Sequence, residues 1–470
     1  MRIISLLIFS ISLILSSCDR DLPTTITGRL TNIQDTTISI IISADPITRI
    51  NPIGYKDVFK INRDGTFSIP IKMEYPSTVT LMSENFNFYA GIVLTQGGEI
   101  SLSADCDDVK ETLEFRGINS SLNAFNLKLQ TFYNEAADEI RQHKDSYLLF
   151  KNGLDSLQSI SIMMLEEFNR SEKLSKKEIL WLKSVINYRK FASLSYRAFD
   201  LNAHPGDSAF QFFQTLNLND QEAIEVSYSY NEAILLYIIH EVNAKGIVHS
   251  SFNDNTEYYK TFFLTINEKL TGKVKDVILT KMISELLNNN DGFAAEYYER
   301  YLVDCKSPEM IVKTSGLYAD YLETINQPLN ENVNLISTDQ KRPMEVLSQF
   351  ENKVVYLDFW ASWCSPCLKG ISYTKELAEH YKNSQLVVLY IGNSDQEANL
   401  INAIKKHNIE GNHVILNEEE TKIWRKEFDI GSIPTYVIID KTGKVHDVNA
   451  PHPKTDKAYH LIDSLLSERN

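Results

Sequence analysis

The stretch Trp-Cys-Ser-Pro-Cys at residues 363–367 is the most informative part of this sequence. It follows the run Val-Val-Tyr-Leu-Asp-Phe-Trp at 354–360, which has the composition of a buried strand. Apolar and aromatic residues then recur at helical spacing, at Tyr373, Leu377 and Tyr381. The pattern predicts a strand, a short turn and a helix, with Cys364 at or next to the N-terminus of that helix.

Two cysteines in this position can carry out thiol–disulfide exchange. Unpaired backbone N–H groups and the helix dipole favour a thiolate at Cys364, and the thiolate is the nucleophile of the exchange. Cys367, one helical turn later, can attack the mixed disulfide and release the partner. A zinc site is the alternative, but it would need a second Cys or His pair at set spacing, and His407 and His413 are irregularly placed. The sequence therefore favours a redox dithiol and no metal.

Residues 358–367, Asp-Phe-Trp-Ala-Ser-Trp-Cys-Ser-Pro-Cys, resemble the active-site segment of the thioredoxin superfamily. They are most similar to the envelope-facing TlpA/ResA-type thiol–disulfide oxidoreductases. A second motif, Gly-Ser-Ile-Pro-Thr at 431–435, resembles the cis-proline loop of the same family. The resemblance implies a thioredoxin-like α/β domain over residues 328–470.

Asp358 lies in an otherwise apolar strand, six residues before Cys364. Burial disfavours the charged form of a carboxyl group and raises its pKa, so Asp358 could exchange protons near neutral pH. The resemblance implies that Asp358 is the acid/base for the second cysteine. A hydrogen-bonded strand residue without a catalytic role is the alternative.

The resemblance also implies a substrate-binding surface. In the family the proline of the second motif, here Pro434, is cis, and the preceding residue, here Ile433, offers its backbone to an extended substrate. Trp363 and Trp360 are expected to pack around the active site and shape access to it, with a core position as the alternative for Trp360. Cis bonds make up only about 5–6% of X-Pro bonds, so the motif and not the base rate leads to this expectation.

Three positions depart from the family pattern. Ser365 stands where many reductases have Gly, Gly370 where TlpA-like members commonly have Glu, and Ser372 where the family has a helix-kinking proline. We therefore expect a redox potential that cannot be transferred from relatives, and different partner contacts near Gly370.

The rest of residues 328–470 alternates strand and helix patterns, as a parallel sheet requires. Strands are predicted at 354–359, 386–391, 414–416, 436–439 and from Lys444, and helices from Cys364, at 396–406, at 421–428 and around Ala458, Leu461, Ile462 and Leu465. The Gly-containing turn at 441–443 predicts an antiparallel hairpin.

The N-terminus has the pattern of a targeting segment. The apolar residues 3–15 are too few to span a hydrocarbon core, which needs ~20 residues, and Leu-Ser-Ser-Cys at 15–18 resembles the lipobox of bacterial lipoproteins. We therefore expect a lipoprotein signal peptide at 1–17, acylation of Cys18 as the membrane anchor, and a tether at 18–25. An ordinary signal peptide with a chance cysteine is the alternative.

The middle of the chain carries two different patterns. Short Ile/Val/Thr/Phe-rich runs with turn signals predict an all-β, sandwich-like domain at 26–118, for which a spacer or docking role is expected. Residues 119–327 predict helices. Cys106 and Cys305 fall in these two regions, and either a bridge or, preferably, two separate thiols is expected.

Composition limits the remaining alternatives. The 470 residues exceed one domain, and a formal net charge of −15 without a basic stripe argues against nucleic acid. Five cysteines are too few for a disulfide-stapled scaffold.

The sequence thus predicts a multidomain thiol–disulfide oxidoreductase that acts as a reductase of protein disulfides through its Cys-Ser-Pro-Cys dithiol and needs no cofactor. It would be lipid-anchored in the cell envelope of a Gram-negative bacterium, facing the periplasm or the outside. The resemblance implies a membrane electron donor of the DsbD/CcdA type. A thiol peroxidase, and a surface binding lipoprotein whose thioredoxin-like module is not enzymatic, are the alternatives.

Overall fold

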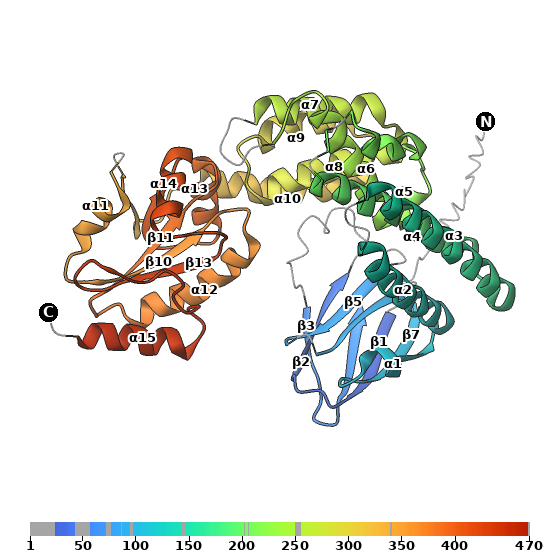
Figure 1. The fold of residues 1–470 in the computed structure, drawn as a ribbon, viewed down its shortest axis with the longest axis horizontal. Helices are drawn as coiled ribbons and strands as arrows, with labels where there is room; N and C mark the ends of the chain where they lie inside the picture. Colours follow the sequence, from blue (N-terminus) through green and yellow to red (C-terminus); the bar gives the residue numbers. More distant parts are fainter. Residues whose placement is uncertain are drawn as a thin grey trace, which may run out of the picture. The chain divides into compact units, whose positions relative to one another are not determined.

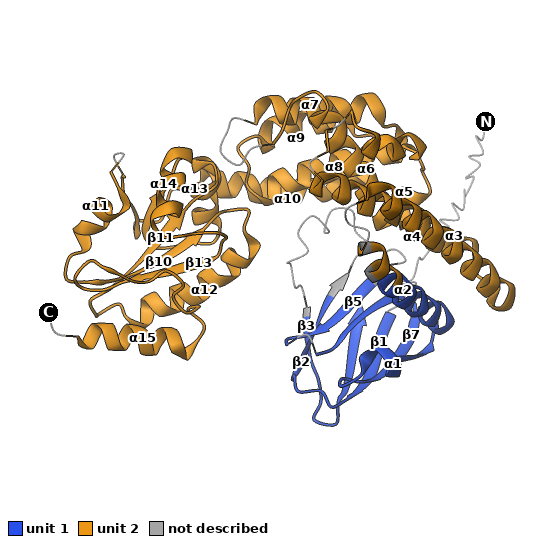
Figure 2. Ribbon diagram, viewed as in Figure 1, with its two compact units in different colours: residues 1–44, 55–135 blue, residues 45–54, 136–470 orange. Residues whose placement is uncertain are grey.

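The computed structural model describes residues 24–42, 57–71, 77–85, 87–94, 97–142, 146–201, 203–204, 206–249, 255–338 and 341–468 (Figure 1). The chain forms two compact units, residues 1–44 with 55–135 and residues 45–54 with 136–470 (Figure 2). The predicted signal peptide and Cys18 lie outside the described residues. Sheets in the N-terminal part, a helical central region and a C-terminal α/β domain make the protein multidomain.

The strands of the N-terminal unit form two four-stranded sheets. One has the order β4 (Thr66–Ile71), β1 (Thr24–Thr31), β7 (Gly98–Asp105), β8 (Glu114–Gly117), and the other β3 (Asp57–Lys60), β2 (Thr37–Ile42), β5 (Ser77–Ser83), β6 (Tyr89–Leu94). Side chains of both sheets enter one buried cluster. Within it, Ile26 pairs with Ile69 on one neighbour and Ile100 on the other, so the β-branched residues form a continuous buried row. A short helix, α1 (Val109–Thr112), precedes β8.

The central region is helical, as its spacing predicts. Its elements are α2 (Ser120–Arg141), α3 (Tyr147–Glu172), α4 (Lys176–Asp200), η2 (Ser208–Thr215), α5 (Ala223–Val226), α6 (Tyr228–Asn243), α7 (Thr256–Lys269), α8 (Gly272–Asn288), α9 (Ala294–Asp304) and α10 (Pro308–Asn326). The division between the two compact units falls within α2. Nearly every residue of α8 from Val274 to Leu287 is buried, in keeping with its wide apolar stripe. Among the helices described, none has the length and apolar character needed to cross a membrane.

The C-terminal domain contains a six-stranded sheet in the order β14 (Val445–Asp447), β13 (Thr435–Ile439), β10 (Val354–Trp360), β11 (Leu386–Gly392), β12 (Gly411–Ile415), β9 (Val333–Leu335). Its helices are α11 (Pro343–Leu347), α12 (Ser365–His380), α13 (Glu397–Lys406), α14 (Glu418–Glu427) and α15 (Asp456–Ser467), with a 3₁₀ turn, η3 (Ser348–Phe350). β10 pairs in parallel with β11 and antiparallel with β13, and every residue of β10 is buried. The predicted parallel start and final antiparallel hairpin are both present.

Two elements of this domain are absent from the sequence-based prediction. β9 pairs in parallel with β12 and forms the edge of the sheet, and α11 follows it. β9 and α11 are therefore part of the folded domain. β9 has only three residues, and two of them are exposed, so it shows no alternation of apolar and polar residues.

Within the second unit, α13 donates three side-chain hydrogen bonds to the helical region. Lys406 Nζ donates to the Asn288 carbonyl (2.7 Å) and Lys405 Nζ to the Ile325 carbonyl (3.0 Å). These carbonyls belong to the last turns of α8 and α10, where the helix dipole favours cations. Asn402 Nδ2 donates to the Asn290 carbonyl (2.9 Å). Charge-assisted capping thus contributes to this contact.

Candidate active site

The end of β10 and the start of α12 bring the two cysteines together. Cys364 is the N-cap of α12, and its Sγ accepts the Cys367 backbone N–H at 3.2 Å. Pro366 occupies the first turn, where a missing N–H costs no helical hydrogen bond. Cys364 and Cys367 form a disulfide with a Cα–Cα distance of 5.2 Å, so the structure is that of the oxidised protein. The arrangement places a sulfur at a helix N-terminus, where a thiolate is stabilised.

Asp358 lies beneath α12, in the middle of β10, and is 1% exposed. Its Oδ2 accepts a hydrogen bond from Thr374 Oγ1 of α12 at 2.7 Å, whereas Oδ1 has no partner among the described residues. Burial raises the pKa of Asp358 to about 7, although the Thr374 hydrogen bond opposes that change. The raised pKa expected from the apolar strand is present, so this carboxyl group can exchange protons near neutral pH.

The predicted proline loop leads into β13. The Ile433–Pro434 peptide bond is cis, as expected. Thr435 pairs with Phe359, so Pro434 lies beside the end of β10 from which the cysteine turn begins. Ile433 is partly buried and packs against two apolar clusters, one on each face of the sheet. One of these clusters contains Cys364 and Cys367. The strand pairing therefore brings the two sequence motifs to the same end of the sheet.

The two tryptophans of the motif have different environments. Trp363 is 52% exposed, and its Nε1 donates to the Ser394 carbonyl at 2.7 Å. This hydrogen bond fixes an exposed aromatic surface next to Cys364. Trp360 is 1% exposed and belongs to the core, which agrees with the alternative left open for it.

Comparison with known proteins agrees with this geometry. Residues 352–445 match the model of the thioredoxin-like family. The C-terminal region contains a thioredoxin-like domain. The thiol-disulfide oxidoreductase ResA of Bacillus cereus is 31% identical over 112 residues, which is 24% of this chain and 63% of the relative. ResA of Geobacillus kaustophilus is 26% identical over 113 residues, which is again 24% of this chain and 63% of the relative. The chain thus covers less than two thirds of these relatives, and they match about a quarter of it.

Solved structures with similarity to this chain include two from other bacteria. A putative thiol-disulfide oxidoreductase from Bacteroides vulgatus is 28% identical and covers 26% of this chain and 83% of its own, with a TM-score of 0.24. A putative thiol:disulfide interchange protein DsbE from Chlorobium tepidum is 27% identical. The match covers 21% of this chain and 68% of the DsbE chain, with a TM-score of 0.20.

A polar network behind the thioredoxin-like active site is absent from the sequence-based prediction. Asp395, just after β11, accepts the Ser362 backbone N–H at 2.6 Å and the Gln396 N–H at 2.8 Å. Burial raises the pKa of Asp395 to about 6, with these hydrogen bonds opposing the change. Asp395 thus holds the turn that presents Cys364. The acidic residue after an apolar strand was the available signal, but only the fold brings it to Ser362.

Arg425 of α14 connects this network to the proline loop. Its Nε donates to the Ile430 carbonyl (3.1 Å), one terminal nitrogen to the Gly431 carbonyl (2.6 Å) and the other to Ser394 Oγ (3.2 Å). One guanidinium therefore ties the loop before Pro434 to the segment that accepts the Trp363 hydrogen bond. Such a multidentate contact is typical of arginine.

Replacement of this guanidinium is expected to loosen the proline loop. An Arg425→Met variant keeps much of the apolar stem and loses all three hydrogen bonds, so we expect the free energy of unfolding to fall by about 2 kcal/mol. If the loop binds extended substrate, KM for a disulfide-containing peptide should rise about tenfold with little change in kcat. Steady-state kinetics and chemical denaturation check both effects. Lys422→Met on the same helix removes exposed ion pairs and serves as the control; an equal rise in KM there would contradict the assignment.

The structure does not bring the histidines considered for a zinc site to the cysteines. His413 is buried in β12, where its Nε2 contacts the Ile409 carbonyl at 2.9 Å. In the part of the chain that the structure describes, no three His, Cys, Asp or Glu residues are grouped to hold a metal ion. Cys106 is half-buried and Cys305 is buried, and neither forms a disulfide within the described residues.

Proposed function

We propose that this protein is an envelope thiol–disulfide oxidoreductase that reduces disulfides of protein substrates. The observation that carries the proposal is the Cys364–Cys367 disulfide at the N-terminus of α12, the helix whose Thr374 contacts the buried carboxyl group of Asp358. The name of the ResA relatives supports the same activity. The predicted lipid anchor at Cys18 and the predicted location in the envelope of a Gram-negative bacterium complete the proposal.

The reaction begins with the reduced dithiol. Cys364 as thiolate attacks one sulfur of the substrate disulfide, which forms a mixed disulfide and releases the other substrate sulfur as a thiolate. Asp358 accepts the proton of Cys367, and the resulting thiolate attacks the Cys364 Sγ. The second substrate sulfur leaves, so that two electrons have passed from the dithiol to the substrate and the protein is left with the disulfide seen in the structure.

The other parts of the chain have supporting roles in this proposal. A dithiol donor must return two electrons to the oxidised protein, and a membrane reductase of the DsbD/CcdA type is the proposed source. Exposed Trp363 and the segment at Ile433 and Pro434 would contact the substrate chain. The sandwich-like β domain at 26–118 would act as a spacer or docking domain.

Insulin reduction tests the proposal. With dithiothreitol as electron source, the protein should accelerate precipitation of the insulin B chain, and Cys364→Ala should lose that acceleration. Cys106→Ala is the matched control, because it removes a half-buried thiol far from α12 in sequence and should retain activity. Equal behaviour of the protein and Cys364→Ala would leave the non-enzymatic binding lipoprotein as the remaining interpretation. Turnover of hydrogen peroxide in place of insulin would favour the thiol peroxidase.

A further inference from the structure

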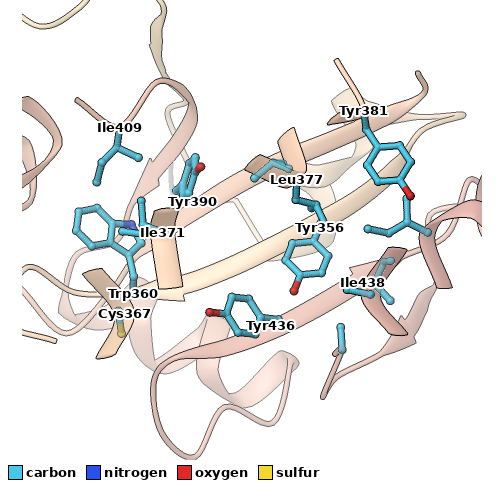
Figure 3. Close-up of a cluster of buried hydrophobic side chains, with 14 of the residues drawn as sticks. Tyr356, Trp360, Cys367, Ile371, Leu377, Tyr381, Tyr390, Ile409, Tyr436 and Ile438 are labelled. Carbon is cyan, nitrogen blue, oxygen red and sulfur yellow. The ribbon is translucent and has the colours of Figure 1, made fainter. Parts of the chain in front are cut away.

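Four titratable side chains form one buried row across the six-stranded sheet of the C-terminal domain. Asp358 of β10 pairs in register with Tyr390 of β11 on one side and with Tyr436 of β13 on the other. Tyr390 in turn pairs with His413 of β12, and the two rings stack at 4.9 Å. In-register neighbours point to the same face of a sheet, so the four side chains share the face covered by α12. Figure 3 shows Tyr390, Tyr436 and Cys367 in the buried cluster on this face.

Each side chain of this row has one polar atom that makes no hydrogen bond to any described residue of the oxidised protein. Tyr390 Oη, Asp358 Oδ1, Tyr436 Oη and His413 Nδ1 are buried without a hydrogen-bond partner among the described residues. A buried hydroxyl group without a partner is costly, and such groups are commonly retained where they have a use in another state. Ionisation of Asp358 is the change of state that creates a demand for donors at this place.

The two ends of the row differ in their access to solvent. At the β12 end, His413 is buried and its second nitrogen contacts a backbone carbonyl. At the β13 end, the Tyr436 ring meets the half-buried His452 edge-on, with centroids 5.3 Å apart. Gly370 of α12 leaves room for this meeting, because a Cβ there would lie 2.6 Å from Tyr436 Oη and 3.8 Å from His452 Nε2.

A backbone hydrogen bond selects one tautomer of the neutral His452. The Lys454 backbone N–H donates to His452 Nδ1 at 3.1 Å, so in the neutral imidazole the hydrogen is on Nε2. Burial and the charge of Lys454 lower the pKa of His452, which favours that neutral form. Tyr436 Oη has no partner among the described residues of the oxidised protein. A hydrogen bond from His452 Nε2–H that forms when Asp358 ionises, directly or through one water molecule, would leave the hydroxyl hydrogen free to point into the domain.

We infer that Tyr436, oriented by His452, is a positioning residue that donates a hydrogen bond to the free oxygen of Asp358 when this carboxyl group ionises. The inference rests on the proposed function in one respect, the role of Asp358 as proton acceptor for Cys367. Asp358 must lose its own proton before it can accept that of Cys367. The chain of donors runs from His452 Nε2–H to Tyr436 Oη–H to Asp358 Oδ1. No electron moves in this step. The proton that leaves Asp358 goes to solvent, and the tyrosine keeps its own.

Several other groups face the two residues and enter the design of the test. Besides Tyr436, those that face Asp358 are Tyr356 of β10, Tyr390 of β11 and Thr374 of α12. Those that face His452 are Tyr373, Tyr436 and Lys454. Tyr356 provides the matched control. It lies two residues before Asp358 on the same strand and stacks on Tyr436, but its Oη donates to the Pro451 carbonyl at 2.7 Å.

The test is an infrared titration of the Asp358 carboxyl group in the oxidised full chain, with Asp358→Asn as the spectral reference. Tyr436→Phe should raise the apparent pKa of Asp358 by about one unit, a tenfold change in proton binding, because the ionised form loses a donor. His452→Ala should shift it in the same direction by less, and Tyr356→Phe should leave it unchanged. The pH profile of insulin reduction should move with the Tyr436→Phe titration.

An unchanged or lowered pKa in Tyr436→Phe, or an equal rise in Tyr356→Phe, would overturn the inference. Loss of the hydroxyl alone should not unfold the domain, since it has no hydrogen-bond partner in the oxidised protein among the described residues. If Tyr436→Phe folds poorly, the titration of Asp358 in His452→Ala decides the question instead, because His452 is only half-buried and its replacement should perturb the fold less. The infrared titration needs no catalysis, so absence of insulin reduction would count against the proposed function and leave this inference to be decided by the spectra.

Discussion

A Cys367→Ala variant is expected to hold its substrate protein as a stable mixed disulfide through Cys364. Cys367 is 1% exposed and already bonded to Cys364 in the oxidised protein, so no rearrangement separates it from the sulfur it must attack. Effective molarities of such well-placed groups reach roughly 10⁵ M. External thiol at millimolar concentration replaces them poorly, and the lifetime of the adduct should lengthen by several orders of magnitude.

Non-reducing electrophoresis followed by mass spectrometry would identify the adducts. Cys364→Ala is the matched variant. It retains one cysteine of the pair, Cys367, which is only 1% exposed and therefore hardly accessible to a substrate. It should trap little or nothing. Adducts that form equally on both variants, or that map to Cys106, would show that Cys364 is not the attacking sulfur.

Asp358→Asn is expected to stabilise the protein at pH 8 while slowing its reaction. Burial raises the pKa of Asp358 from 3.8 to about 7, so the folded protein binds this proton more tightly than the unfolded chain does. The cost of the carboxylate is absent below pH 3.8, grows as the pH rises to about 7 and is constant above that. Each pKa unit corresponds to about 1.4 kcal/mol, so the variant should gain about 4 kcal/mol in the free energy of unfolding at pH 8.

Chemical denaturation followed by tryptophan fluorescence, at pH 8 and near pH 4, would measure the gain and its disappearance in acid. Asp440→Asn is a control of opposite sign, because hydrogen bonds from Thr442 and Lys444 outweigh burial and lower the pKa of Asp440. That variant should lose stability at pH 8. Resolution of the mixed disulfide should slow by about 10²–10⁴-fold in Asp358→Asn, as expected for removal of a general base. A destabilised Asp358→Asn at pH 8 would contradict a buried carboxyl group with a raised pKa.

Residues close together in sequence were the ones that sequence alone could place. Cys364, Cys367 and Asp358 belong to one strand–turn–helix segment, and Pro434 belongs to a second short motif, so local patterns were sufficient for them. Asp395 accepts a hydrogen bond from Ser362, and Arg425 donates one to Ser394, only because the fold brings these distant segments together at one end of the sheet. Nothing in the local sequence of Arg425 distinguishes it from a solvent-exposed residue of α14.

The two element boundaries that differ from the prediction have different physical causes, one local and one long-range. α14 begins at Glu418, earlier than the predicted 421, because Asn417 and Glu420 form a capping box ahead of the apolar positions. β12 begins at Gly411, earlier than the predicted 414, because its first residues are defined by pairing with β9 and β11. Pairing partners that lie far away in the chain leave no periodic signal in the strand itself.

The pairing of β9 with β12 has a practical consequence for anyone who wishes to isolate the redox domain. A fragment cut where the family match begins, at residue 352, would lack Val333–Leu335 and leave Gly411–Ile415 as an open edge. Unpaired strands of this kind recruit other copies and aggregate. It would also lose Asn330 and Asn332, whose side-chain amides donate to Glu410 just before β12. A soluble fragment should therefore start before Asn330.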